Sequence, residues 1–247
     1  MKYHFVGLIF GSVLAWGAFA TQTEAPLLTN SILVRADSAT VNSPCLSDTE
    51  ISAQLQVLSS SQSLSQQESV QNNLIAEAKK STECRKRVVE ALLGTLKVTR
   101  LDPKNDPPSF YLWHYGSQIL SSLKAVEALD LFIKHFDLDD GTAFPLNHHP
   151  TVVNIIRMGS LALPKLEAVL LKSNDPNSRH YAVFCIASIG GTNARKILEQ
   201  ALPLETNPCV ASFIKASLDA FQRSGRSDQI ASEAQTEWYG AFLCNSR

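Results

Sequence analysis

The chain of 247 residues lacks every short motif that marks a common catalytic or nucleotide-binding centre. It has no Gly-x-Ser-x-Gly nucleophile turn, no Walker phosphate loop, no glycine-rich dinucleotide fingerprint and no His-Glu-x-x-His pair. Each of these motifs places backbone N–H groups or side chains where a reaction needs them, so their absence removes the usual enzyme classes. We therefore expect a protein that is not an enzyme and that uses no cofactor and no metal.

The chain also lacks an excess of charge of either sign. It carries 22 Lys and Arg residues against 23 Asp and Glu residues, a formal net charge of −1. A short basic run, Arg85-Lys86-Arg87, is flanked by Glu83 and Glu90, as on a solvated helix face. A nearly neutral protein has no general electrostatic attraction to nucleic acid or anionic lipid. We expect no nucleic acid among its partners.

Long apolar runs are missing after the first twenty residues, MKYHFVGLIFGSVLAWGAFA. Lys2, the apolar stretch Phe5–Trp16 and the small residues ending at Ala20 form the pattern of a secretory signal peptide at 1–20. The apolar run 5–20 has 16 residues, fewer than the roughly 20 that a bilayer span needs. We predict export to the periplasm or the exterior, with no membrane attachment after cleavage. The polar, proline-bearing segment 21–44 is predicted to be flexible.

The chain has only five cysteines, and export favours their pairing. Cys45 precedes the first expected helix and Cys84 lies near the start of the third, so an up-down-up array places both at one end. Cys209 begins a late helix and Cys244 ends the helix after it, and antiparallel packing brings these ends together. We predict the disulfides Cys45–Cys84 and Cys209–Cys244, with Cys185 free and buried. The alternative is that all five are reduced core residues.

What the sequence does contain is an internal repeat. Trp113–Phe136 and Arg179–Leu202 match in chemistry when shifted by 66 residues, and His114 falls on His180. Self-similarity of this kind indicates stacked helix pairs, each of which buries its apolar face against its neighbours. Repeat-equivalent positions two units apart are too distant to share one metal ion. A structural role for the two histidines is therefore favoured.

Side chains suited to capping mark several helix starts. Asp175-Pro176 and Asn207-Pro208, 32 residues apart, each combine an N-cap residue with proline at the first helical position. Ser47-x-x-Glu50 and Ser65-x-x-Glu68 have the spacing of capping boxes. The recurring Pro-marked starts indicate a repeat period near 32 residues.

These patterns predict an all-α fold of about eleven helices. The stretch 45–98 is expected to hold N-terminal helical repeats. The segment 99–108 is expected to be a linker, because its prolines exclude a continuing helix. The stretch 109–247 is predicted to be the main repeat array, closed by a capping helix over 227–243 that carries Trp238, Tyr239 and Phe242.

The longest loop of the array, 137–150, gathers acidic and imidazole side chains. Asp137, Asp139 and Gly141 have part of the spacing of a calcium loop, but His148 stands where an EF-hand needs glutamate. Zinc would need two further well-placed ligands that the sequence does not show. A solvated loop is therefore favoured over a metal site.

The run from Ile155 to Phe221 resembles HEAT-like repeats of the kind grouped with phycobilin-lyase HEAT domains. The resemblance lies in IIRMGSLALPKLEAVLL, KSNDPNSRHYAVFCIASIGG and TNARKILEQAL, which combine an apolar helix, a small-residue turn and an Asp-Pro linker. Arg179 stands where the family has its linker-proximal arginine, whereas Ala211 stands at the corresponding position one repeat later. The resemblance implies a right-handed α-α superhelix, or solenoid, and carries no chemistry with it.

Binding in such arrays usually takes place on the concave side, which the second helix of each pair lines. Alternation with the inward residues Leu131, Leu166 and Ile197 exposes a set of polar side chains on these helices. We predict that the following residues contact a partner: Asp130, Lys134, Lys165, Lys172, Lys196, Glu199 and Gln200. Both charge signs occur in the set, and an ordinary solvated surface is the alternative.

The favoured function is that of an exported, non-enzymatic scaffold that docks an unknown protein or peptide on this side. One alternative is an accessory enzyme of the chromophore-lyase type, because related HEAT-like repeats occur there, although export argues against it. The other alternative is a purely structural component of the cell envelope.

Overall fold

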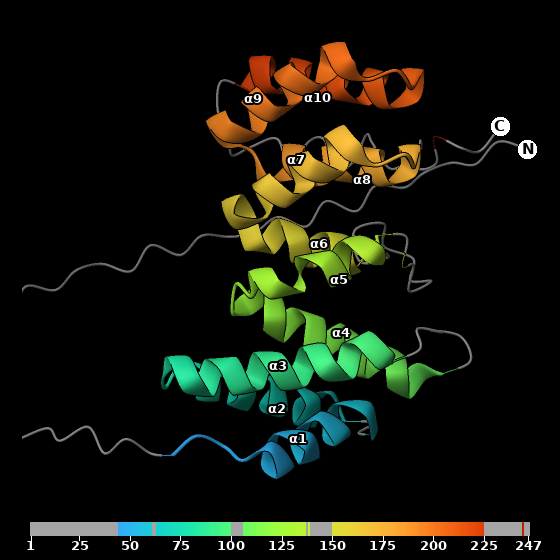
Figure 1. The fold of residues 1–247 in the computed structure, drawn as a ribbon. Helices are drawn as coiled ribbons and strands as arrows, with labels where there is room; N and C mark the ends of the chain where they lie inside the picture. The colour runs from blue at the N-terminus through green and yellow to red at the C-terminus, as the bar shows by residue number, and fades with distance from the viewer. Residues whose placement is uncertain are drawn as a thin grey trace, which may run out of the picture. The chain divides into compact units, whose positions relative to one another are not determined.

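Every regular element in the described part of the chain is a helix (Figure 1). The computed structural model describes residues 44–60, 63–99, 106–136, 138, 150–224 and 244. All of these residues belong to one compact unit, Asn42–Arg247. The expected all-α class is therefore confirmed for the described residues. The predicted signal peptide 1–20 and all but the last residue of the segment 21–44 lie outside them.

Ten α-helices and three short 3₁₀-helices make up the described part. The α-helices are α1 (Asp48–Ser60), α2 (Leu64–Ala78), α3 (Thr82–Val98), α4 (Pro107–Ser122), α5 (Leu129–Lys134), α6 (Pro150–Met158), α7 (Leu163–Lys172), α8 (Pro176–Ile189), α9 (Gly191–Ala201) and α10 (Pro208–Ser224). The 3₁₀-helices are η1 (Val126–Ala128), η3 (Gly159–Ala162) and η4 (Leu202–Leu204). The last helix that the sequence predicts, over 227–243 with Trp238, Tyr239 and Phe242, lies outside the described residues.

Side-chain caps start several helices where the sequence predicts them. The Ser47 N–H donates to Glu50 Oε2 at 2.7 Å and the Glu50 N–H donates to Ser47 Oγ at 3.3 Å, which forms a capping box at the start of α1. Asp175 accepts from two backbone N–H groups at the start of α8, and Asn207 does the same at the start of α10. Each cap satisfies N–H groups that have no partner inside the helix.

Two helix starts differ from the prediction. α2 begins at Leu64, directly after its N-cap Ser63, so Ser65 lies inside the first turn and the second predicted capping box is wrong. α4 begins at Pro107, with Asp106 as its N-cap, and takes in the last two residues of the predicted linker 99–108. Proline lacks an N–H, and the first turn of a helix is the place where that loss has no cost.

The helices pack so that each even-numbered helix from α4 onward contacts the next one. α4 contacts α6, α6 contacts α8, and α8 contacts α10. α7 and α9 contact each other and both contact α8, while α4 also contacts α1, α2 and α3. In Figure 1 these helices follow one another in chain order, from blue α1 to orange α10. Contacts between successive helix pairs are what stacked repeats require.

One continuous apolar core runs through these helices. Trp113 of α4 is fully buried and meets Phe132 of α5 edge to face, with ring centroids 6.1 Å apart. The predicted inward residues Leu131, Leu166 and Ile197 are all buried. This burial confirms the inward helix stripes that the sequence predicts.

Gly116 lets α4 pack closely against α3. A Cβ atom placed at Gly116 would lie 3.2 Å from the Leu96 side chain and 3.3 Å from that of Leu92. Such distances are shorter than ordinary van der Waals contact, so a larger residue at Gly116 would have to displace both leucines.

Two disulfides join the cysteines as the sequence predicts. The S–S distance is 1.95 Å between Cys45 and Cys84 and 2.08 Å between Cys209 and Cys244. Cys185 is free and buried. Two disulfides fit an oxidising environment outside the cytoplasm.

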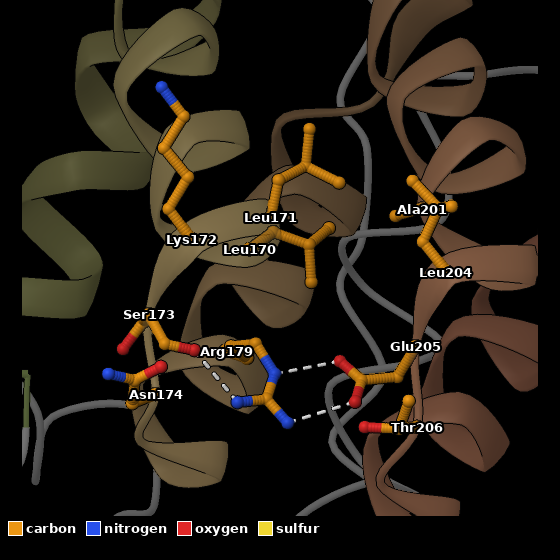
Figure 2. Close-up of a pocket in the computed structure, with 10 residues that line it drawn as sticks. All are labelled: Leu170, Leu171, Lys172, Ser173, Asn174, Arg179, Ala201, Leu204, Glu205 and Thr206. Atoms are coloured by element: carbon orange, nitrogen blue, oxygen red, sulfur yellow. Dashed lines mark hydrogen bonds and ion pairs between the residues drawn. The ribbon is translucent and has the colours of Figure 1, made fainter.

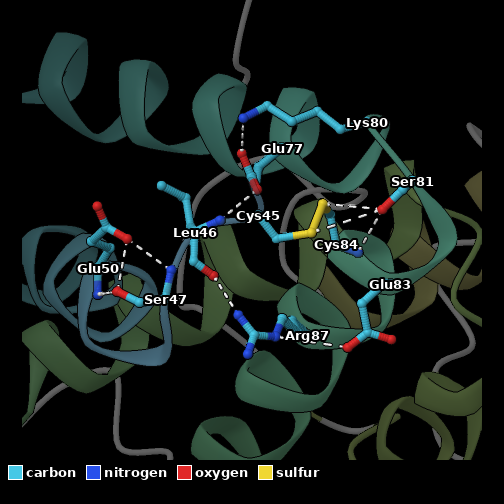
Figure 3. The surroundings of a disulfide bond; sticks show 10 residues. All are labelled: Cys45, Leu46, Ser47, Glu50, Glu77, Lys80, Ser81, Glu83, Cys84 and Arg87. Carbon is cyan, nitrogen blue, oxygen red and sulfur yellow. Dashed lines mark hydrogen bonds and ion pairs between the residues drawn. A yellow bond between two sulfur atoms is a disulfide. The ribbon is translucent and has the colours of Figure 1, made fainter. Parts of the chain in front are cut away.

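The Cys45–Cys84 disulfide fixes the residues before α1 to the start of α3 (Figure 3). The Leu46 N–H donates to Glu77 Oε1 at 2.7 Å, and Arg87 donates to the Leu46 carbonyl at 3.1 Å. The entry of the chain into α1 is therefore held both covalently and by hydrogen bonds from two further helices, α2 and α3.

Candidate functional site

The predicted partner-binding residues all lie exposed on α5, α7 and α9. We call this set the α5–α7–α9 face. α5 carries Asp130 and Lys134, α7 carries Lys165 and Lys172, and α9 carries Lys196, Glu199 and Gln200.

Two ion pairs neutralise part of this face. Lys165 Nζ lies 2.6 Å from Asp130 Oδ1 and so connects α7 with α5. Arg195 Nε lies 2.7 Å from Glu199 Oε1, one helical turn away on α9. All four side chains are exposed, so each pair adds little to the stability of the fold.

The pairing leaves the α5–α7–α9 face with a net positive charge. Its two acids, Asp130 and Glu199, are both engaged, whereas Lys134, Lys172 and Lys196 have no ion-pair partner among the described residues. The Arg195–Glu199 pair lies within one turn of α9 and is therefore a local contact. The Lys165–Asp130 pair, by contrast, depends on α5 and α7 lying side by side, which the sequence does not show.

A pocket of about 230 Å³ opens beside this face (Figure 2). Its walls come from the end of α7, the loop into α8, the first turn of α8, and the end of α9 with η4 and the loop that follows. The lining residues are Leu170, Leu171, Lys172, Ser173, Asn174, Arg179, Ala201, Leu204, Glu205 and Thr206. Lys172 therefore belongs both to the α5–α7–α9 face and to the pocket.

A bidentate ion pair joins the two sides of the pocket. Arg179 Nε donates to Glu205 Oε2 at 2.8 Å, and one of its terminal nitrogens donates to Glu205 Oε1 at 2.9 Å. The other terminal nitrogen donates to the Ser173 carbonyl at 2.8 Å. Glu205 also accepts from the Asn207 N–H at 2.7 Å. The side chains are 12% and 4% exposed, so this is a nearly buried clamp between the first turn of α8 and the loop that precedes α10.

The clamp fixes the ionisation of both partners. Burial alone would raise the pKa of the Glu205 carboxyl, but the hydrogen bonds and charge of Arg179 outweigh burial and lower it. Hydrogen bonding to Glu205 raises the pKa of the Arg179 guanidinium. Both groups therefore stay charged near neutral pH, and the lowered pKa makes the Glu205 carboxylate a weak base.

Two large apolar side chains lie on the rim of the pocket. Leu171 is 43% exposed on one side and Leu204 is 68% exposed on the other (Figure 2). Large exposed apolar side chains beside a concave site are typical of contact surfaces. Together with Lys172 and the hydroxyl groups of Ser173 and Thr206, they equip the pocket to bind a mixed apolar and polar group.

The repeat-equivalent histidines have separate surroundings. His114 Nε2 lies 2.7 Å from Gln118 Nε2. His180 is 2% exposed, stacks on Phe213 with ring centroids 4.1 Å apart, and has its Nδ1 3.4 Å from Cys244 Sγ. Burial lowers the pKa of His180 to about 4, so its ring is neutral at neutral pH.

Two further sequence predictions concern possible chemistry. Cys185 is fully buried, and burial raises the pKa of its thiol, which makes it unsuited to act as a nucleophile. The residues of the 137–150 loop that resemble metal ligands, Asp137, Asp139 and His148, lie outside the described residues.

Sequence reasoning missed the pocket, the Arg179–Glu205 clamp and the contact between His180 and Cys244. A partial signal for the pocket was present, because Leu171 lies off the inward stripe of α7 and Arg179 follows the Asp-Pro linker. The partners of Arg179 and His180, by contrast, are far along the chain and no local pattern indicates them.

Within the described ranges, no helix combines the length and the apolar character that crossing a bilayer requires. No protein-family model, curated protein or solved structure matches the chain. The resemblance to HEAT-like repeats therefore stays a prediction.

Proposed function

We propose that the chain is an exported, non-enzymatic interaction protein that docks a partner protein or peptide on the α5–α7–α9 face. In this proposal the stacked helix pairs form a HEAT-like α-solenoid, and the face is its concave side. The observation that carries the proposal is the pocket beside Lys172, with the exposed Leu171 and Leu204 on its rim.

The partner's chemistry follows from the pocket and the charges around it. A pocket of about 230 Å³ accommodates one side chain rather than a folded domain, and Leu171 and Leu204 on its rim offer apolar contact beside its polar lining. The ammonium groups of Lys134, Lys172 and Lys196, which have no ion-pair partner among the described residues, favour acidic residues next to that side chain. The favoured partner is therefore an acidic segment with an apolar group that contacts the two leucines.

The pocket is preformed, which favours binding. The Arg179–Glu205 clamp holds its two sides together without a ligand. A site that needs no ordering loses less conformational entropy when the partner arrives.

Export is proposed on two grounds. The first twenty residues have the pattern of a signal peptide, and the two disulfides fit an oxidising compartment such as the periplasm or the exterior. A chromophore-lyase-type accessory enzyme is less favoured, because the only charged acid among the pocket residues is held by Arg179. A purely structural envelope component would not require a pocket with exposed leucines.

The test is site-specific photo-cross-linking in cells that export the protein. A photoreactive phenylalanine derivative replaces Leu171 or Leu204, and in matched controls it replaces the exposed Leu64 of α2 or Val98 of α3. We expect a discrete adduct from the two pocket positions and none from the controls. The adduct should disappear when Lys134, Lys172 and Lys196 are changed together to glutamate.

Equal adducts from all four positions would show that the pocket has no special role. An adduct that survives the triple charge reversal would remove the acidic partner from the proposal. Adducts only at Leu64 and Val98 would place binding on another surface.

A further inference from the structure

Three side chains with affinity for soft metals converge at the Cys209–Cys244 disulfide. His180 comes from α8, Cys209 is the second residue of α10, and Cys244 is distant in sequence. The His180 imidazole and the two Sγ atoms lie within 4.8 Å of one another. The sequence predicts no metal site because these ligands come from three separate segments.

His180 is poorly satisfied where it stands. Its ring is buried and held in place by the stacked ring of Phe213. Among the described residues, Nδ1 faces the sulfur of Cys244 and Nε2 has no hydrogen-bond partner. Sulfur is a weak hydrogen-bonding group, and a buried polar atom without a strong partner is costly. A bond from Nδ1 to a cation would replace this weak contact with a strong one.

One spacing of the site already suits tetrahedral coordination, while the two sulfurs, 2.08 Å apart in the disulfide, have to separate to roughly 3.8 Å when the bond is reduced. Zinc bonds of about 2.3 Å to sulfur and about 2.0 Å to nitrogen place a sulfur and a nitrogen ligand roughly 3.5 Å apart on one tetrahedral edge. The His180 Nδ1 to Cys244 Sγ distance is 3.4 Å. Cys209 is fixed on the other side, because its N–H donates to the Asn207 side chain at 3.0 Å.

We propose that the dithiol form of this site binds a thiophilic divalent cation, of which Zn²⁺ is the type, through His180, Cys209 and Cys244. His180 is buried and both cysteines are half-buried, and these three residues supply three of the four ligands that zinc takes. The disulfide form does not bind, because thiolates and not disulfide sulfurs are the ligands. The cation and the disulfide are then mutually exclusive states of one site. This proposal rests on the cluster alone and is independent of the proposed docking function.

Reduction and metal binding each conserve electrons and protons. A phosphine reductant gives two electrons to the Cys209–Cys244 bond and takes up the oxygen of one water molecule. The two protons of that water go to the two sulfurs. Zn²⁺ then replaces both thiol protons, which are released to solvent, while the neutral imidazole donates a lone pair.

The other disulfide provides an internal comparison. Cys45 and Cys84 lie close to Glu77, which also brings three possible ligands together. The Glu77 carboxylate, however, already accepts from the Leu46 N–H at 2.7 Å and pairs with Lys80 at 2.7 Å. Because the Glu77 carboxylate already has strong partners, a cation would stabilise it less than it would stabilise His180. We therefore assign the metal site to His180, Cys209 and Cys244.

The experiment uses the full exported chain, reduced with a phosphine and desalted under inert gas. Co²⁺ reports tetrahedral thiolate coordination through its visible and charge-transfer absorption, and competition with Zn²⁺ gives the zinc affinity. We expect one cobalt ion per reduced chain and none per oxidised chain. His180→Gln should weaken zinc binding at least about tenfold, the low end of what losing even an outer-shell partner costs. The matched control, Cys45→Ser with Cys84→Ser, should leave the spectrum unchanged.

A His180→Gln chain that binds with unchanged affinity and spectrum would overturn the proposal. The proposal would also be overturned if the cobalt spectrum were lost in the Cys45→Ser/Cys84→Ser control and kept in Cys209→Ser. If a variant fails to fold, the rate of cysteine alkylation in the reduced chain of unchanged sequence, measured with and without Zn²⁺, tests the proposal. Zn²⁺ should slow alkylation of Cys209 and Cys244 and leave that of Cys45 and Cys84 unchanged. Equal protection of all four cysteines, or of none, contradicts the assignment.

Discussion

Arg179 and Glu205 form two parallel hydrogen bonds, of 2.8 and 2.9 Å, across 26 positions of sequence. The pair joins the first turn of α8 to the loop before α10 and closes one side of the pocket. These two parts of the chain are thus connected by a nearly buried ionic contact as well as by apolar packing.

Arg179→Ala should lower the free energy of unfolding by about 3 kcal/mol, because it leaves the Glu205 carboxylate buried without its partner. Urea denaturation measures the loss. The matched control is Arg195→Ala, whose exposed pair with Glu199 should contribute less than about 1 kcal/mol. Equal losses in the two variants would mean that the Arg179–Glu205 clamp is not a stabilising contact.

Stability should depend on pH through His180. Its pKa is about 4 in the folded chain against an ordinary 6.5, so the unfolded chain binds the proton more readily. The free energy of unfolding is highest above pH 6.5, where the His180 ring is neutral in both states. It falls as pH drops from 6.5 through 4, because the unfolded chain takes up the proton first. The full shift corresponds to about 3 kcal/mol. His180→Gln should flatten the unfolding free energy between pH 4 and 6.5, and an unchanged slope in that variant would contradict the assignment.

Removing the first disulfide should destabilise the chain through the unfolded state. Cys45 and Cys84 are 39 positions apart, and a cross-link over a loop of this length contributes about 2–4 kcal/mol. The double change Cys45→Ser with Cys84→Ser avoids a free thiol that can mispair. We expect its urea midpoint to fall without a change in helical circular dichroism. A loss below about 1 kcal/mol would show that the hydrogen bonds of Leu46 hold this region by themselves.

Substitution of two glycines on neighbouring helices should change the stability of the fold in opposite directions. Gly116→Val places methyl groups against Leu96 and Leu92 and should cost about 1–3 kcal/mol. A Cβ atom added at Gly94 of α3 would meet nothing within 4 Å, so Gly94→Ala should raise stability by up to about 1 kcal/mol through helix propensity. Thermal unfolding of the two variants compares them directly. A neutral Gly116→Val would mean that α3 and α4 can separate without loss.

Features that depend on nearby residues were predictable. The caps at Asp175 and Asn207 form with N–H groups two and three positions along, so their partners are fixed by the local sequence. α3 (Thr82–Val98) lies in the stretch 45–98 where helical repeats are predicted, and its start is capped by Ser81 while its apolar stripe continues to Leu96. The Ser65 capping box failed because two serines, Ser63 and Ser65, compete for one helix start, and spacing alone does not choose between them.

By itself, then, the sequence determined the all-α class, the caps that start α1, α8 and α10, the inward stripes and the pairing of four cysteines. The caps follow from hydrogen bonds within a turn, and the stripes follow from the helical period. Only the tertiary structure decided that Lys165 neutralises Asp130, where the pocket opens and which groups surround His180. Asp130 meets Lys165, Arg179 meets Glu205 and His180 meets Cys244 because segments far apart in the chain pack side by side. A contact between residues so far apart in the chain is set by the packing of side chains between helices, which no local pattern encodes.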